Sequence, residues 1–219
     1  MERFTIAQVT LSDLERVVDL RENTGTEHTW TQVDEITLTE DEERRLADIR
    51  EHLVGRQIHL LNEATIWSRA IYPLLILAET PDIQAWAEVP LQAIYAHFSL
   101  DGIADGVLGK SSIGRIKAPY LVMVETKHGV ENANPIFQLY GQLLAAARIN
   151  WENDGNDPQE IFGCYTIADS WTFVRGQVEA LQGERPILSI EASGEYVEKI
   201  EMEMILKILK SIISRYIPQ

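Results

Sequence analysis

Two stretches decide the fold of this chain: Leu100-Asp101-Gly102-Ile103-Ala104-Asp105-Gly106-Val107-Leu108 and Pro119-Tyr120-Leu121-Val122-Met123-Val124-Glu125-Thr126-Lys127. Both are short, apolar, rich in β-branched residues and bounded by glycine or proline, which predicts two buried strands. Strand side chains alternate between faces, so Glu125 and Lys127 point to one face and Thr126 to the other. A carboxylate and an ammonium group at the end of an apolar strand are costly to bury unless they are paired or bind something.

Asp105, on the neighbouring predicted strand, offers a second carboxylate. Two carboxylates with a backbone carbonyl group are the oxygen ligands that a hard divalent cation prefers. The simpler alternative is an ion pair between Glu125 and Lys127 with no further role, because a three-residue motif without context is weak. Other polar side chains that belong to the same site would favour the metal interpretation.

Residues 56–79 have the periodicity of a helix, with an apolar stripe at Leu60, Ala64, Trp67, Ile71, Leu74 and Ala78. Helical geometry places Glu63 about 20° from the direction of Leu74, so Glu63 is expected to face the core. An ionised glutamate there needs a partner or a raised pKa. The partner is either the predicted site or a buried arginine or lysine. Pro73 is expected to kink or restart this helix.

A second polar helix is predicted to begin at Asn134-Pro135, an N-cap residue followed by proline at the first helical position. Gln138 and Gln142 share one face of this helix with a glycine and an alanine. Amides beside such small residues permit close approach of a ligand or another backbone, although glutamines on a solvated face are the alternative.

The order of these features resembles the PD-(D/E)XK nuclease superfamily, and more narrowly the nuclease regions of type I restriction motor subunits. The resemblance covers roughly residues 56–176. It is carried by Asn62-Glu63-Ala64, Leu100-Asp101-Gly102-Ile103-Ala104-Asp105, Val124-Glu125-Thr126-Lys127 and Gln138-Leu139-Tyr140. The stretches at residues 162–166 and 171–175 look like the two strands that usually follow. Ala104 departs from the family pattern, which often has proline there.

The resemblance implies an α/β fold with a mixed central β-sheet flanked by helices, a restriction-endonuclease-like core. It also implies an enzyme, a Mg²⁺-dependent endonuclease that hydrolyses phosphodiester bonds, with Mn²⁺ able to substitute and DNA as the expected substrate. Asp105, Glu125 and the backbone carbonyl of Thr126 would hold the metal. Glu63 would ligate a second metal or hold a water on it.

Lys127 would then orient the attacking water or stabilise the developing charge, since a compact ammonium group suits both roles. Gln138 would position Lys127 or a phosphate, and Gln142, one turn later, is the alternative. Without metal, Lys127 is expected to pair with the carboxylates. A catalytically silent nuclease-like protein, which binds nucleic acid or a protein and cuts nothing, is the alternative function.

The net charge of −15 is the main objection to a nuclease, because affinity for phosphates comes from lysine and arginine. The excess lies mostly in residues 1–100, which carry 18 acidic and 8 basic side chains. We therefore expect weak, selective or partner-assisted binding of nucleic acid. The predicted phosphate-facing residues are Lys110, Arg115 and Lys117, in the loop joining the two strands, and Arg175. A merely solvated hairpin loop is the alternative for the first three.

The chain is expected to form one domain. Residues 1–55 would be an acidic N-terminal extension, residues 56–177 the nuclease-like core, and residues 178–219 a final strand and C-terminal helix. Thr39 and Glu42 form a capping-box signal for a helix reaching about Val54. A single cysteine, Cys164, and the absence of a long apolar run predict a cytoplasmic protein that does not enter membranes. A homodimer and an unidentified protein partner are further expectations.

Overall fold

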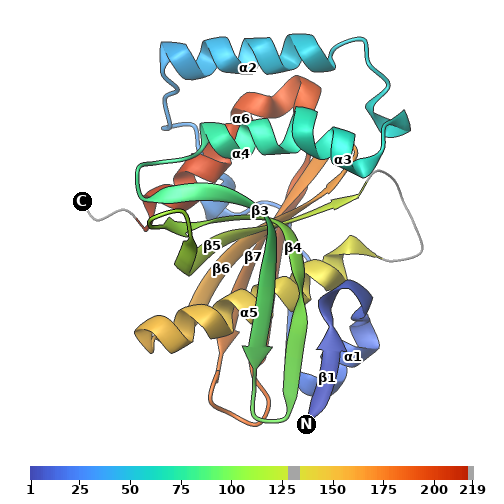
Figure 1. The fold of residues 1–219 in the computed structure, drawn as a ribbon, viewed down its shortest axis with the longest axis vertical. Coiled ribbons are helices and arrows are strands. Elements are labelled where there is room, and N and C mark those ends of the chain that lie inside the picture. Colours follow the sequence, from blue (N-terminus) through green and yellow to red (C-terminus); the bar gives the residue numbers. More distant parts are fainter. Residues whose placement is uncertain (128–133, 217–219) are drawn as a thin grey trace.

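The computed structural model describes residues 1–127 and 134–216, which form a curled, mixed β-sheet with helices on both faces (Figure 1). The predicted mixed α/β architecture is thereby confirmed. The strands are β1 (Glu2–Thr5), β2 (Asp19–Asn23), β3 (Ile83–Ile94), β4 (Phe98–Ser111), β5 (Ile116–Lys127), β6 (Gln159–Ile167), β7 (Ser170–Glu179) and β8 (Ile187–Val197). The α-helices are α1 (Leu11–Val17), α2 (Glu40–Leu53), α3 (Glu63–Ile66), α4 (Tyr72–Leu77), α5 (Pro135–Asp154) and α6 (Glu198–Ser214).

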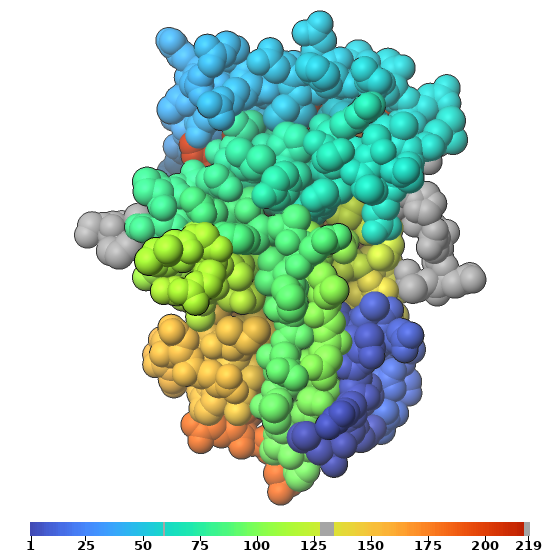
Figure 2. Space-filling model, viewed as in Figure 1, coloured from blue at the N-terminus to red at the C-terminus, as the bar shows by residue number. Residues whose placement is uncertain are grey.

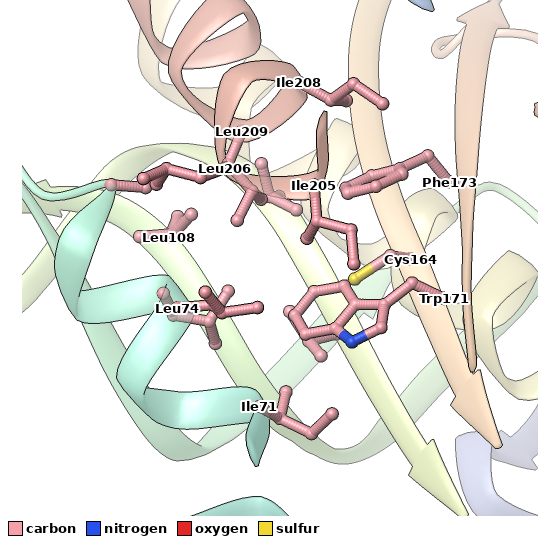
Figure 3. Close-up of a cluster of buried hydrophobic side chains, with 14 of the residues drawn as sticks. Ile71, Leu74, Leu108, Cys164, Trp171, Phe173, Ile205, Leu206, Ile208 and Leu209 are labelled. Carbon is pink, nitrogen blue, oxygen red and sulfur yellow. The ribbon is translucent and has the colours of Figure 1, made fainter. Parts of the chain in front are cut away.

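Two hydrophobic cores lie on the two faces of the sheet. On one face, α2, α4 and α6 enclose a core with the sheet, and Figure 3 shows Trp171 and Phe173 packed between Leu74 of α4 and Ile205 of α6. On the other face, α5 crosses the sheet and buries almost its whole middle section. Within the described residues, no helix has both the length and the hydropathy needed to cross a membrane.

The N-terminal segment belongs to the sheet. The strand β1 pairs in parallel with the start of β4, and β2 pairs in parallel with β8. Only α2, which begins after the predicted Thr39 capping box, lies away from the sheet, against α4 and α6. The space-filling view shows α2 across the top of the molecule and the dark-blue N-terminal segment beside β4 (Figure 2). Residues 1–55 are therefore an integral part of the sheet and its cover, and the expectation of a separate extension was wrong.

The helix predicted over residues 56–79 is shorter and irregular. It begins at Glu63, because the Asn62 side chain accepts a hydrogen bond from the Thr65 amide and caps it. A π-helical turn, η4 (Trp67–Ile71), then joins α3 to α4. Pro73 lies in the first turn of α4, where a missing amide proton costs least.

The strand β4 positions the site. The antiparallel strand β3 pairs with β4 along one edge, while β1 and β5 share the other edge. The pairing with β1 ends at Asp101, and the pairing with β5 begins only at Gly106. Residues 102–105 pair with neither strand on this edge, and we call this opening the fork. Asp105 is the residue of the fork next to β5.

Candidate active site at the fork between β4 and β5

Asp105 bridges the fork through its side chain. Its Oδ2 atom accepts a 2.7 Å hydrogen bond from the backbone amide of Thr126. In an extended strand the amide and carbonyl groups of one residue point toward the same neighbour, so the Thr126 carbonyl also faces the fork. Burial raises the pKa of Asp105, and the negative charges of Glu63 and Glu88 add to this effect. The Thr126 amide and the Lys127 ammonium group oppose it.

Glu125 lies opposite Asp105 when the β4–β5 register, Gly106 with Val124, is continued by one residue. It is 3% exposed. Its Oε1 atom lies 2.9 Å from Lys127 Nζ, and its Oε2 atom accepts a 2.5 Å hydrogen bond from Gln142 Nε2. Burial, followed by the charge of Asp105, raises the pKa of Glu125 to about 7. The two adjacent carboxylates thus resist being ionised together without a further positive charge.

Lys127 forms the ion pair that the sequence predicts, with Glu125 as its partner. Burial alone would lower the pKa of Lys127. The hydrogen bond and charge of Glu125, together with the charges of Glu63 and Asp105, outweigh burial and raise it. Lys127 therefore keeps its proton at neutral pH and presents a fixed positive charge at the fork.

The two candidate glutamines have different partners. Gln142, fully buried on α5, donates to Glu125 as described above. Gln138 instead donates a 2.9 Å hydrogen bond to the backbone carbonyl of Ala7, and so ties α5 to the N-terminal segment. Of these two residues, the structure brings only Gln142 into hydrogen-bond contact with a predicted site residue. The preference for Gln138 failed because its contact with Ala7 is made over a long sequence separation.

Glu63 reaches the site by an unexpected route. It is exposed, because it is the first residue of α3 and not part of a buried stripe. It nevertheless lines the same pocket, of about 340 Å³, as Asp105 and Thr126. The remaining lining residues are Ala64, Trp67, Ala87 and Glu88. Gly106 permits this arrangement, since a Cβ atom there would lie 2.3 Å from the Trp67 indole ring.

The donor set suits a hard divalent cation. Asp105 and Glu125 supply adjacent carboxylates whose mutual repulsion is offset by positive charge, and the Thr126 carbonyl faces the same opening. Asp105 uses only one of its two oxygens in hydrogen bonds within the described chain. In residues 1–127 and 134–216 no three Asp, Glu, His or Cys side chains already converge as a preformed metal cage. Exposed side chains such as Glu63 would have to turn toward the ion.

The four predicted phosphate-facing residues lie away from this pocket. Lys110 and Lys117 are cross-strand partners at the far end of the β4–β5 hairpin, and Arg115 is in its turn. Five strand residues separate Asp105 from Lys110, about 17 Å. The Arg175 side chain is held by Glu160 at 2.6 Å and Glu191 at 3.1 Å, which list the only acidic partners it has in the described chain.

Glu88 is the site residue that sequence reasoning missed. It lies on β3 between residues paired with Gly106 and Ala104, which places it opposite Asp105. The sequence does hold one signal for this. The β3–β4 turn at residues 96–97 fixes the hairpin register, and counting back from it aligns Glu88 with Asp105.

The sequence matches no protein-family model, and it has no significant match among curated proteins. The chemistry of the fork is therefore argued from its own residues.

Proposed function

We propose that this protein is a metal-dependent nuclease that hydrolyses phosphodiester bonds, with DNA as its expected substrate. The observation that carries the proposal is the meeting of Asp105, Glu125 and Lys127 at the fork. The order of the surrounding elements supports it: α3 with Glu63, the strands β4 and β5, then α5, β6 and β7. This order is the one expected from the resemblance to the PD-(D/E)XK superfamily.

The carboxylates of Asp105 and Glu125 and the carbonyl of Thr126 would hold Mg²⁺, or Mn²⁺ in its place. Two carboxylates about 4 Å apart repel each other by about 4 kcal/mol at an effective dielectric constant of 20, so the pair favours a bound cation. When bound, such an ion neutralises phosphate charge and lowers the pKa of a water molecule.

The chain's own residues have separate roles around this centre. Lys127, protonated at neutral pH, supplies a positive charge that stabilises negative charge developing on a phosphoryl oxygen. Gln142 holds the Glu125 carboxylate in one orientation through its 2.5 Å hydrogen bond. Gln142 thus takes the part of a positioning residue that the sequence assigned to Gln138.

The test is cleavage of supercoiled plasmid DNA in Mg²⁺, in Mn²⁺ and in chelator. We expect Asp105→Asn and Lys127→Met to lose about 10²-fold or more of the activity. The matched control is Asp101→Asn, on the same strand but engaged with Gln92, which should retain activity. Cleavage that survives in both site variants would contradict the proposal, as would cleavage that is unchanged by chelator.

A catalytically silent binding protein is the second candidate. It is favoured by the net charge of −15 and by the distance of Lys110, Arg115 and Lys117 from the pocket. If the wild type binds nucleic acid but cuts no plasmid, linear, single-stranded or branched DNA and no RNA in either metal, this second function replaces the first.

A further inference from the structure

Three acidic side chains face one pocket that has no basic lining residue. Glu63 from α3, Glu88 from β3 and Asp105 from β4 line the same 340 Å³ space, and the other four lining residues are uncharged. Their proximity is electrostatically significant, since the charges of both glutamates raise the pKa of Asp105. Like charges gathered beside an apolar wall need a cation or remain repulsive.

An unsatisfied buried hydroxyl group lies at the same pocket. Thr126 is 1% exposed, and its Oγ1 atom has no hydrogen-bond partner in the described chain. Strand alternation puts this side chain on the face opposite Glu125, the face of Val124. Across the β4–β5 pairing Val124 meets Gly106, against which Trp67, itself a lining residue, is packed. The Thr126 hydroxyl therefore points to the α3 side of the fork, where Glu63 and Glu88 are.

Glu88 also adopts an unfavourable backbone conformation. Its φ angle is 52°, in the left-handed region, which glycine adopts freely and a glutamate adopts at a cost. The residues on both sides of it, Ala87 and Val89, keep their regular pairing with β4. A glycine at this position would relieve the strain, so the presence of a charged side chain here calls for a role of that side chain.

We propose that Glu88, together with Glu63 and the Thr126 hydroxyl group, forms a second divalent-cation site on the α3 side of Asp105, which the two sites share. The proposal rests on the proposed function, because it adds a second ion beside the one held by Asp105 and Glu125. Glu63 and Glu88 are exposed, so their side chains are free to turn toward such an ion. Oxygen ligands from two carboxylates and a hydroxyl suit Mg²⁺ or Mn²⁺.

The test counts bound Mn²⁺ per chain, by calorimetry and by electron paramagnetic resonance of free Mn²⁺. We expect two ions for the wild type and for Asp101→Asn, but one for Glu88→Gln and for Glu63→Gln. A Glu88→Gln variant that still binds two ions with affinities within twofold of the wild type overturns the proposal.

The variant Glu88→Gly separates loss of a ligand from loss of structure. It removes the carboxylate and relieves the left-handed backbone, so its metal-free melting temperature should rise while the second Mn²⁺ is lost. A single wild-type ion that disappears in Glu125→Gln and survives in Glu88→Gln would refute the second site and leave the proposed nuclease function standing. A wild type that binds no Mn²⁺ at all would refute both.

Discussion

The backbone amide of Thr126 donates to Asp105 Oδ2 at 2.7 Å, at the point where main-chain pairing between β4 and β5 ends. A side chain thus takes the place of the next ladder bond. This keeps the two strand ends close without closing the fork, so the Thr126 carbonyl remains directed into the opening. The fork is a rigid product of the sheet, and Glu125 and Lys127 are positioned by a strand and not by a loop.

The pair Gln142→Leu and Gln138→Leu should separate positioning from stability. Removing Gln142 takes away a hydrogen bond that lowers the pKa of Glu125. We therefore expect Mg²⁺ or Mn²⁺ affinity at pH 7 to fall by about 10- to 100-fold, as for other residues that orient metal ligands. Gln138→Leu removes only the contact with Ala7 and should cost about 1 kcal/mol of stability with unchanged metal affinity. Calorimetry and urea denaturation measure the two effects, and equal metal affinities in both variants would contradict the assignment.

Metal affinity should depend on pH through Glu125. Because the pKa of this carboxyl group is raised to about 7, it carries a proton at pH 6 that must leave before a cation can bind. Mg²⁺ or Mn²⁺ affinity is therefore expected to rise by up to about tenfold per pH unit below pH 7 and to level off above it. Calorimetric titrations between pH 5.5 and 8.5 test this. A flat profile below pH 7 would show that Glu125 is not a ligand.

Glu198, the first residue of α6, should make the protein less stable as pH rises. It is fully buried, its Oε2 atom accepts a 2.8 Å hydrogen bond from the Trp171 indole, and its Oε1 atom has no partner in the described chain. Burial raises its pKa from 4.5 to about 8. The folded state then binds more protons than the unfolded state between these values. The stability contributed by Glu198 is accordingly full below pH 4.5 and is lost as the pH rises through about 8.

The variant Glu198→Gln keeps an oxygen acceptor for Trp171 and removes the titration. At about 1.4 kcal/mol per pKa unit, it should gain on the order of 3 kcal/mol over the wild type at pH 8 compared with pH 5. Glu125 has the same sign of effect, so some pH dependence should persist in this variant. Urea denaturation at pH 5, 6, 7 and 8 provides the measurement, with the exposed Glu195→Gln as control. Parallel stability curves for wild type and Glu198→Gln would contradict the prediction.

Gly106→Ala should disturb the wall of the pocket. The added methyl group would lie 2.3 Å from the Trp67 ring, so the indole must move, at a cost of about 1–3 kcal/mol in unfolding free energy. Gly194→Ala, whose added methyl group meets nothing within 4 Å, is the matched control in another strand of the sheet. Trp67→Leu combined with Gly106→Ala should recover part of the loss. Equal urea midpoints for the two alanine variants would show that the contact is unimportant.

Local sequence patterns predicted much of what surrounds the site. The two quoted stretches form β4 and β5, and the Asn134 cap starts α5, because apolar runs, proline and capping residues act within a few residues. The pair of Glu125 and Lys127 follows from strand alternation alone. These features could be predicted because they depend on a period or on a single turn.

The features that were missed depend on distant partners. Gln138 is drawn to Ala7, and Arg175 to Glu191, by contacts that no local pattern records. The orientation of Glu63 changed because Asn62 starts the helix there, which removed the upstream turns assumed in the periodicity. Glu88 became visible only through the hairpin register. Charge counts along the chain likewise could not tell a phosphate-facing lysine from one at the far end of a hairpin.

The pairing of β2 with β8 has a consequence for synthesis. Residues 19–23 find their strand partner at residues 187–191, so at 5–20 residues per second they wait roughly 10 to 30 s on the ribosome before it exists. An apolar strand left exposed for that time would invite aggregation. The sequence of β2, Asp19-Leu20-Arg21-Glu22-Asn23, is instead dominated by charged and amide side chains. Its composition is suited to a strand that emerges early from the ribosome and is among the last to be paired.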